Sequence, residues 1–414
     1  MGSGAAFSGG AAAANSASTV FYNPAGMSLL KQNELLAGVS FLYSDLDFGD
    51  RASVLSNSTP ISGGDGGNGG GFVAIPHVYA VYDLKPDVKF GIGLNAPYGL
   101  VTQYDEDHKG RYNETLTSFK HLNLNPSLSW RMNTKWSFGA GLNFSYAKLR
   151  LRQAVDFGTT CSNALGAAAC LTNFSLVAGQ TDGSAQIDAD DYSFGLNFGV
   201  LFQPRPGTRI GAHYRSKIEY NFRVDGRFTV GAGARAFLTA AGVPNAFTNG
   251  KGDTEITIPE TASISVYHDV TDKLALMSDL TWTRWSRFDE LRIEFDEPST
   301  PTNLLLTNWH DTIRIAFGGA YRWDEKLTLR SGLAFEQGPI DTPFRGPGIP
   351  DSDRFEVAIG AGYRLTETIS LESSYVHLFF RDGATVRTSP TGSLLIGDFR
   401  NSVDVVTLGL RWTF

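Results

Sequence analysis

The chain has 414 residues, of which 42% are hydrophobic and 12% aromatic, and its formal net charge is −7 at pH 7. No stretch approaches the ~18 consecutive apolar residues of a membrane-spanning helix, which excludes a bundle of such helices. The acidic balance argues against nucleic acid as a partner. The 46 glycines, the aromatic residues and many short polar turns are typical of an all-β chain.

Residues 1–32 precede the first predicted strand and form the first of two predicted domains. This segment is rich in Gly, Ala and Ser and contains the sequence FYNPAGM at Phe21 to Met27. Its composition alone is typical of a disordered tail. A compact turn sequence directly before a strand is equally compatible with a plug, or hatch, folded into the lumen of a barrel. Both interpretations stay open from the residues alone.

An alternation of period two dominates residues 33–414, the second predicted domain. From Trp136 to Tyr146 every second residue is apolar, and the residues between them are small or polar. Successive side chains of a strand point to opposite faces, so this segment has one apolar and one polar wall. The pattern returns at 192–202, 313–323 and 406–414.

The alternation alone does not separate a soluble β-sandwich from a transmembrane barrel. The exposed face of a sandwich usually carries charges and Thr, whereas the polar face here consists of Gly, Ser and Asn with scattered charges. Aromatic residues also cap the apolar face at the strand ends. This combination favours a barrel with lipid outside and a crowded polar lumen inside.

Six short polar turns alternate with seven longer segments and predict fourteen strands. The turns lie near 84–87, 132–135, 203–207, 270–273, 323–326 and 365–368, and the longer segments near 49–70, 105–112, 155–186, 231–252, 297–307, 341–351 and 384–397. Short turns on one side and long loops on the other are typical of outer-membrane barrels. An open sheet edge in hydrocarbon would leave backbone groups unpaired, so we predict a closed, antiparallel, 14-stranded transmembrane β-barrel.

Six segments resemble, in order, the FadL family of outer-membrane transporters of long-chain fatty acids and other hydrophobic compounds. They are FYNPAGM at 21–27, APYGL at 96–100, WSFGAGLNFSYAK at 136–148, WTRWSRF at 282–288, NWHDTIRIAFG at 308–318 and IPDSDRF at 349–355. The resemblance implies a fourteen-stranded barrel plugged by an N-terminal hatch. The hatch is expected to be anchored at Asn23, Pro24, Ala25 and Gly26. Relatives carry a signal peptide and further hatch residues ahead of the segment matching Gly4 to Gly10, so a trimmed or internal start is expected.

The third predicted strand contains residues that disturb strand pairing. Gly91, Gly93, Pro97 and Gly99 lie near its middle; Pro removes a ladder donor and Gly favours bulges. Simple strand irregularity is the alternative. The family resemblance implies that the ligand leaves sideways beside a kinked third strand. Together these features favour a lateral opening at Asn95, Ala96, Pro97, Tyr98 and Gly99.

The resemblance also implies basic side chains inside the barrel that bind the ligand's carboxylate head group. Matching by position gives His310, where relatives commonly carry Lys, and Lys148. His310 shares the lumen-facing phase of Arg314, so its titration predicts ligand affinity that weakens between about pH 5.5 and 8; a hydrogen-bonded histidine in the wall is the alternative. Lys148 shares the lipid-facing phase of Phe144 unless a bulge inverts it. Arg150 is kept as a substitute, and a solvated rim charge as the other interpretation.

Two long loops, 155–186 and 231–252, are unusually apolar. Exposed separately they would be an aggregation hazard, so they are expected to pack together. In the family this pair of loops forms the groove that first receives the ligand, which predicts a capture groove at Phe157, Leu171, Phe174, Phe237, Leu238 and Phe247. Mutual packing without binding is the alternative. Cys161 and Cys170 are the only cysteines, and in an oxidising compartment a local disulfide is expected.

These observations predict a passive importer of long-chain fatty acids or similar hydrophobic molecules in the outer membrane of a Gram-negative bacterium. The ligand is captured by the extracellular loops, bound in the barrel and released laterally. No enzymatic activity, cofactor, metal or nucleic acid is expected. The expected partners are the hydrophobic ligand, outer-membrane lipid and lipopolysaccharide, and the chain is expected to be a monomer. Uptake of aromatic hydrocarbons and a general diffusion porin are the alternatives.

Overall fold

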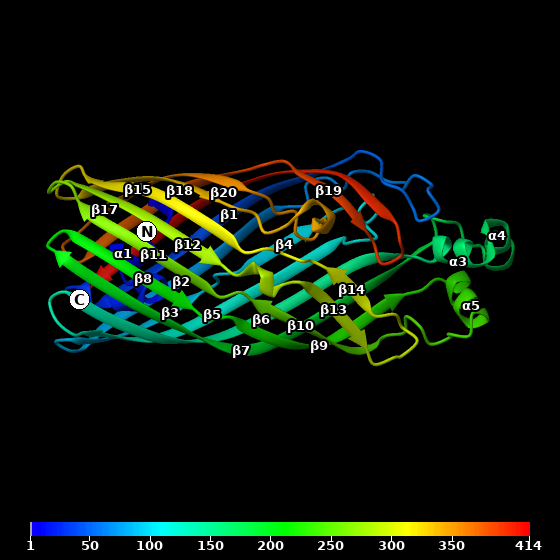
Figure 1. Cartoon of the computed structure of the whole chain (residues 1–414), viewed down its shortest axis with the longest axis horizontal. Coiled ribbons are helices and arrows are strands. Elements are labelled where there is room, and N and C mark those ends of the chain that lie inside the picture. Colours follow the sequence, from blue (N-terminus) through cyan, green and yellow to red (C-terminus); the bar gives the residue numbers. More distant parts are fainter. Residues whose placement is uncertain (1) are drawn as a thin grey trace.

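The computed structural model describes residues 2–414, which form a closed antiparallel barrel (Figure 1). Within these residues fourteen strands cross the wall, and six of them consist of two segments each. β1 (Glu34–Asp50) pairs along its whole length with β20 (Leu394–Thr413), from Glu34 with Thr413 to Asp50 with Gly397. This pairing joins the first and last strands and closes the barrel, so the predicted fold class is confirmed.

The remaining strands follow the chain order around the wall. The other uninterrupted ones are β2 (Gly71–Lys85), β5 (Leu116–Arg131), β6 (Trp136–Asp156), β7 (Asp182–Arg205), β16 (Leu327–Glu336) and β17 (Arg354–Arg364). The interrupted ones are β3 (Val88–Asn95) with β4 (Gly99–Gln103), β8 (Thr208–Arg215) with β9 (Ile218–Thr229), β10 (Gly250–Ile258) with β11 (Thr261–Asp269), β12 (Leu274–Thr283) with β13 (Glu290–Phe295), β14 (Asn303–Leu306) with β15 (Thr312–Arg322), and β18 (Ile369–Phe380) with β19 (Gly383–Thr388).

The side chains of β6 alternate as predicted. Trp136, Phe138 and Phe144 are exposed on the outer surface, whereas Ser137 and Asn143 are buried inside. In a membrane barrel the exposed apolar face contacts lipid acyl chains. The distribution of apolar and polar side chains is therefore the reverse of that in a soluble protein, with apolar residues outside and polar residues inside.

The helices gather at the two ends of the barrel. The N-terminal segment, residues 2–30, lies inside the barrel near the end with the short turns, as Figure 1 shows. It contains η1 (Gly2–Ala5), α1 (Gly10–Ala13), α2 (Thr19–Tyr22) and η2 (Pro24–Leu29). At the opposite end lie α3 (Phe157–Leu165), α4 (Ala167–Phe174) and α5 (Ala232–Ala240). Two further short helices connect strands: η3 (Trp285–Arg287) between β12 and β13, and η4 (Thr342–Phe344) between β16 and β17. No helix among residues 2–414 combines the length and apolar character needed to cross a membrane.

Two predicted loops differ from the structure. The segment 297–307 contains β14, which pairs with β13. Residues 384–397 were expected to form a loose segment, but β19 and β20 pair there from Gly383 with Phe399 to Thr388 with Leu394. Buried Thr385 and Leu395 face inward from this hairpin. The strands therefore continue past the region where apolar alternation identifies them in the sequence.

Candidate functional site

The N-terminal segment is fixed inside the barrel by the side chain of Asn23. This residue is fully buried, and its Nδ2 donates to the carbonyl oxygens of Ala11, at 2.6 Å, and Val200, at 3.0 Å. Its Oδ1 accepts from the backbone N–H of Ala25 at 3.0 Å. Pro24 then begins η2, whose residues contact β5, β6 and β7. Asn23 thus ties two parts of the segment to each other and to the wall.

Glycines on the inner wall provide the space for this segment. A Cβ atom on any of three of them would collide with its backbone or with Asn23. The distances are 1.9 Å from Gly199 to Asn23 Oδ1, 1.9 Å from Gly211 to the Ala11 carbonyl oxygen and 2.3 Å from Gly139 to the Ala25 nitrogen. The small residues on the polar wall therefore have a packing function that their alternation in the sequence does not reveal.

Wall arginines also bind the N-terminal segment. Each donates to a backbone carbonyl oxygen of that segment: Arg209 to Ala13 at 2.6 Å, Arg215 to Phe21 at 2.9 Å and Arg314 to Ala6 at 2.7 Å. Sequence reasoning missed Arg209 and Arg215 as contacts of this segment, although it placed Arg314 on the lumen face. A charged residue at a lumen-facing position of an otherwise small and polar wall is the signal that could have identified them.

At the opposite end the apolar loops pack together. α3 and α4 are joined by the predicted disulfide between Cys161 and Cys170, which is present and buried. The ring of Phe157 meets Phe247 edge-on at 5.2 Å, and Phe174 meets Phe237 at 5.8 Å. The two loops therefore share one hydrophobic core.

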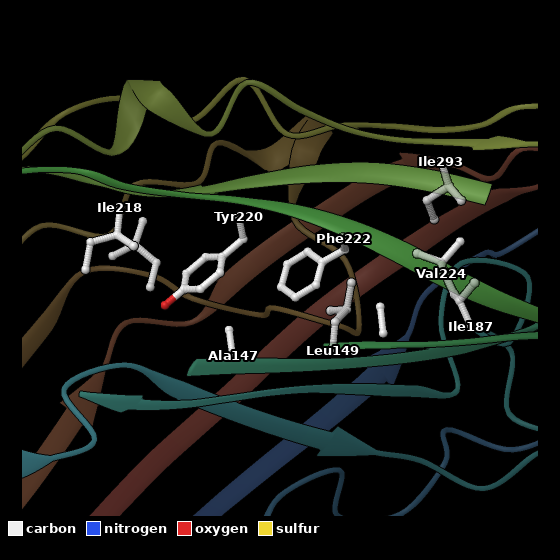
Figure 2. Close-up of a cluster of buried hydrophobic side chains, with 10 residues drawn as sticks. Ala147, Leu149, Ile187, Ile218, Tyr220, Phe222, Val224 and Ile293 are labelled. Atoms are coloured by element: carbon white, nitrogen blue, oxygen red, sulfur yellow. The ribbon is translucent and has the colours of Figure 1, made fainter. Parts of the chain in front are cut away.

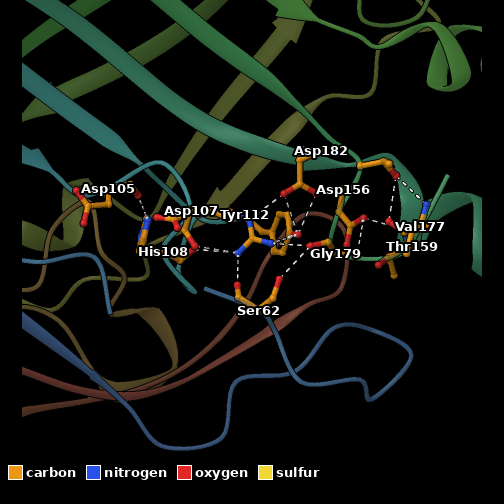
Figure 3. Close-up of polar contacts among 12 residues, drawn as sticks. Ser62, Asp105, Asp107, His108, Tyr112, Asp156, Thr159, Val177, Gly179 and Asp182 are labelled. Carbon is orange, nitrogen blue, oxygen red and sulfur yellow. Dashed lines mark hydrogen bonds and ion pairs between the residues drawn. The ribbon is translucent and has the colours of Figure 1, made fainter. Parts of the chain in front are cut away.

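A polar network joins the loop between β4 and β5 to the loop at residues 155–186 and to the loop between β1 and β2 (Figure 3). Arg111 Nε lies 2.8 Å from Asp182 Oδ2, and Arg111 Nη1 donates to the Ser62 carbonyl oxygen at 2.7 Å. The Tyr112 hydroxyl donates to the Asp182 carboxylate at 3.0 Å. Nearby, burial lowers the pKa of His108 to about 4. The loop at residues 155–186 thus has polar contacts with two neighbouring loops in addition to its apolar core.

Beneath the loops lies a cavity of about 580 Å³, a volume within the range of small-molecule sites. Four of the six predicted groove residues line it, namely Phe157, Phe237, Leu238 and Phe247, whereas Leu171 and Phe174 do not. Further apolar side chains come from the wall: Leu151, Ile187, Phe228, Phe288, Leu291, Ile293, Phe295 and Leu305. The structure thus places most of the predicted groove over a largely apolar cavity.

The charged side chains in the cavity lining are Arg152 and Glu114. Arg152 Nη1 lies 2.9 Å from Glu106 Oε1, and Arg152 Nε donates to Thr115 Oγ1 at 3.2 Å. The carboxylate of Glu106 is largely exposed. Burial raises the pKa of Glu114, and the guanidinium of Arg387 opposes that shift. Arg152 is therefore the positive charge that a ligand in this cavity would meet.

None of the three predicted head-group residues lines the cavity. Lys148 and Arg150 are exposed on the outer face of β6 and flank Leu149, which is buried in the interior. The pairing of β6 with β7 runs without a register shift from Trp136 to Asp156, so no bulge inverts these residues. The expectation that either one faces the lumen is wrong, and Arg150 instead forms an ion pair with Asp188.

His310 is also absent from the cavity lining, because the strand is interrupted before it. β15 begins only at Thr312, and Asn308 has a left-handed backbone with φ of 41°. The phase of Arg314 therefore does not extend to His310, whose side chain is about half exposed, with Nε2 3.9 Å from Asp341 Oδ1. Its neighbour Trp309 is buried instead.

An apolar cluster continues from the cavity into the barrel. The interior cluster comprises Ala147, Leu149, Ile187, Ala189, Ile218, Tyr220, Phe222, Val224, Ile258 and Ile293. Figure 2 shows its side chains converging inside the barrel from β6, β7, β9 and β13. Ile187 and Ile293 belong both to this cluster and to the cavity lining. The predicted polar lumen is thus apolar in its outer half.

The wall is broken where the third strand was expected to be kinked. β3 ends at Asn95 and β4 begins at Gly99. The pairing of β2 with β3 reaches only Val78 with Leu94, and no pairing joins β2 to β4 within residues 2–414. Tyr98 packs against the interior cluster. An apolar surface therefore runs from the loops through the cavity to the break.

Comparisons with known proteins agree with this architecture. A protein-family model described as "Outer membrane protein transport protein (OMPP1/FadL/TodX)" matches residues 1–414. "Outer membrane protein P1" of Haemophilus influenzae is 30% identical over 91% of this chain and 83% of that protein. "Long-chain fatty acid transport protein" of Escherichia coli K12 is 28% identical over 91% of this chain and 85% of that protein.

Solved structures share the fold. A Pseudomonas aeruginosa FadL homologue has a TM-score of 0.90 at 24% identity, with 100% of this chain and 97% of that chain covered. The toluene transporter TodX of P. putida has a TM-score of 0.68 at 18% identity, with coverages of 96% and 94%. The chain therefore belongs to the OMPP1/FadL/TodX family, the transporters of hydrophobic compounds in the outer membrane of Gram-negative bacteria.

Proposed function

We propose that this protein imports long-chain fatty acids passively and releases them sideways into the outer membrane. The observation that carries the proposal is the apolar surface that links loops, cavity, interior cluster and wall break. Wetting an acyl chain costs about 0.8 kcal/mol for each CH₂ group. A dry path that ends in lipid avoids this cost, whereas a water-filled pore does not.

The carboxylate head group binds in the cavity at Arg152. The guanidinium already holds the exposed carboxylate of Glu106 at 2.9 Å, and a ligand carboxylate takes that place. The tail lies against the phenyl rings and aliphatic side chains of the same cavity. Arg152 thus has the role that the sequence assigned to Lys148, Arg150 and His310.

Residues 1–32 act as the hatch of the barrel, which is formed by residues 33–414. A fourteen-stranded barrel is too wide to be filled by its own side chains, so a separate plug prevents solute leakage. Asn23, Pro24, Ala25 and Gly26 anchor this plug, which rests against wall glycines. The protein acts as a monomer, with its apolar outer face against lipid and its loops against lipopolysaccharide.

Uptake of aromatic hydrocarbons is the second candidate, because phenyl rings are abundant in the cavity lining. They belong to Phe157, Phe228, Phe237, Phe247, Phe288 and Phe295. An aromatic hydrocarbon has no carboxylate that could pair with the guanidinium of Arg152. Competition between oleate and toluene for the cavity, measured with the wild type and with Arg152→Met, therefore separates the two candidates. If fatty acids are the cargo, the substitution should weaken oleate binding and leave toluene binding unchanged.

Conductance in planar bilayers, combined with oleate binding in nanodiscs, tests the proposal. We expect no steady large ion current from the wild type, together with saturable oleate binding. Steady large currents without oleate binding would identify a general diffusion porin and contradict the proposal.

A further inference from the structure

Two lysines lie side by side on the outer face of the barrel, close to the wall break. Lys120 on β5 and Lys148 on β6 are directly opposite each other in the strand register, and both residues are exposed. Like charges directly opposite on neighbouring strands destabilise the pairing. Neither lysine forms an ion pair within residues 2–414, in contrast to Lys89, Lys109, Lys217 and Lys251. The pair therefore has positive charge that no ion pair within the described chain neutralises.

The neighbours of this pair leave it open to a ligand from outside. On the side of the break, Lys120 is opposite Gly99 of β4, which has no side chain. On the other side, Lys148 is opposite Asp190 of β7. These four residues form one row across the strands, with two basic side chains and one acidic side chain. Lys120 thus has no acidic neighbour within its row, and the break side of the row is free of side chains.

The arginines farther out add to the positive charge. Arg150, two residues beyond Lys148, forms an ion pair with Asp188, and Arg227 lies 3.7 Å from the same carboxylate. Two guanidinium groups thus share one carboxylate, which leaves no acidic group here for the lysines. Two residues of a strand span about 7 Å, which is within the screening length of about 8 Å at physiological ionic strength. An anion at the lysines is therefore attracted by these arginines as well.

The rows on the other side of the lysines place the pair at the edge of the hydrocarbon. The adjacent row contains Leu122, Tyr146 and Tyr192, and the two tyrosine rings are 4.8 Å apart. The row after it contains Phe144 and Phe194, which are both exposed on the outer face. Aromatic residues form girdles at the interfaces of a membrane barrel. The lysines follow such a girdle directly, so they lie at the level of the lipid head groups.

The head groups at this level belong to the outer leaflet of the outer membrane, because the long loops are on the same side. That leaflet consists of lipopolysaccharide, whose lipid A carries phosphate groups next to its acyl chains. A phosphate monoester has a charge of about −1.5 to −2 at pH 7 and three acceptor oxygens. One phosphate can therefore pair with two ammonium groups, whereas a carboxylate has a single charge. Lysine binds phosphate as a point charge, so the pair suits a phosphate of lipid A.

We propose that Lys120 and Lys148 bind a phosphate group of lipid A on the outer face of the barrel, beside the wall break. The phosphate lies between the two ammonium groups, and the acyl chains lie along the tyrosine and phenylalanine rows toward the middle of the membrane. The site needs only the outer-membrane location of the barrel, so it stands apart from the proposed import of fatty acids. In proteoliposomes made of phospholipid alone this site has no lipid A to bind.

Native mass spectrometry of the barrel in an uncharged detergent tests this site. The protein is titrated with lipid A that carries both phosphates or with the same lipid after dephosphorylation. EDTA removes divalent cations that could bridge a phosphate to a carboxylate. The variants are Lys120→Gln, Lys148→Gln and the double variant. Lys251→Gln is the matched control, because Lys251 on β10 is also exposed but forms an ion pair with Asp225.

We expect the wild type to prefer the phosphorylated lipid A. Each single substitution should reduce this preference roughly fivefold and the double variant roughly twenty-fivefold, from the typical contribution of one lysine at a charged membrane surface. Lys251→Gln should leave the preference unchanged, and circular dichroism checks the folding of every variant. Equal binding of both lipids by the wild type, or an unaltered preference in the folded double variant, would overturn the site. Displacement of lipid A by an equal concentration of oleate would assign the lysines to a carboxylate and would also contradict it.

Discussion

The inner and outer halves of the barrel are built from the same strands but have opposite interiors. On β6, Ser137 and Asn143 face inward in the half that holds the N-terminal segment, whereas Ala147 and Leu149 face inward farther out. The outer face changes in the reverse sense, from Phe144 to Lys148. The same alternate positions point inward along the whole strand. Where the wall leaves the hydrocarbon, the inward residues change from polar to apolar and the outward residues from apolar to charged, since charged side chains avoid lipid.

This difference supports the proposal that the two halves have different tasks. In the inner half, hydrogen bonds from wall side chains and close contacts with wall glycines fix the N-terminal segment. In the outer half, apolar side chains line a cavity and an interior cluster that reaches the break beside Tyr98. A polar, filled half suits retention of solutes, and an apolar, hollow half suits passage of an acyl chain.

The largest effect is expected from overfilling the inner half. Gly199→Leu places side-chain atoms where Asn23 Oδ1 lies, because even a Cβ would come within 1.9 Å of it. The N-terminal segment should be displaced, and a bilayer that shows no steady current with the wild type should conduct steadily. In Gly49→Ala the new Cβ has 3.6 Å to its nearest neighbour, so this variant should behave like the wild type. If the Gly199→Leu barrel folds but shows no steady ion current, the N-terminal segment does not plug the pore.

A polarity change in the outer half should block uptake. Leu149→Gln buries an amide in the interior cluster, which costs about 1–3 kcal/mol when the amide finds no partner. We expect oleate uptake by proteoliposomes to fall roughly tenfold. Lys148→Gln, one residue away on the outer face, is the matched control and should leave uptake unchanged. Equal effects of the two substitutions would contradict the division into inner and outer faces.

Removal of the cavity charge should have an effect of similar size on ligand affinity. Arg152→Met removes a charge-assisted hydrogen bond worth about 1.5–3 kcal/mol, so the affinity for oleate should fall about tenfold or more. Arg150→Met and His310→Ala should not alter it, because neither residue lines the cavity. The measurement is equilibrium binding of oleate in nanodiscs. A loss of oleate affinity in His310→Ala, with no loss in Arg152→Met, would indicate that the ligand head group binds at His310.

The smallest expected effect is an acid-sensitive opening of the loop at residues 104–115. Burial lowers the pKa of His108 to about 4, below its ordinary value of about 6.5. The neutral ring therefore stabilises the closed loop fully above about pH 6.5, and this contribution declines as the pH falls toward 4. After correction for the intrinsic exchange rate at each pH, the loop amides should be less protected from hydrogen exchange at pH 5 than at pH 7.5. His108→Gln should remove this difference, and its persistence in the variant would assign it to another group.

The sequence predicts those parts of the molecule that depend on local alternation. Period-two segments such as Trp136 to Tyr146 identify the strands, and the turns give their number. Asn23 and the break at residues 96–98 coincide with short motifs whose residues restrict the backbone. The disulfide follows from two cysteines in one loop.

Long-range geometry limits the prediction elsewhere. The basic residue that lines the cavity is Arg152. The resemblance pointed instead to Lys148, with Arg150 as a substitute, although the phase of the strand placed Lys148 on the outer face. Arg152 has the same phase as these two residues, so alternation along β6 does not single it out. His310 falls outside the extrapolated phase because the strand is interrupted at Asn308. The contacts of Arg209 and Arg215 with the N-terminal segment join residues far apart in the chain, so no local pattern predicts them.

Photo-crosslinking with a diazirine-bearing oleate analogue tests the lateral route most directly. After uptake begins in outer-membrane vesicles, we expect crosslinks at cavity residues, then at Tyr98 and the neighbouring outer half of β2, with labelled lipid appearing afterwards. Crosslinks that instead pass through residues 2–30 to the end with the short turns would show axial passage, and would contradict release through the wall.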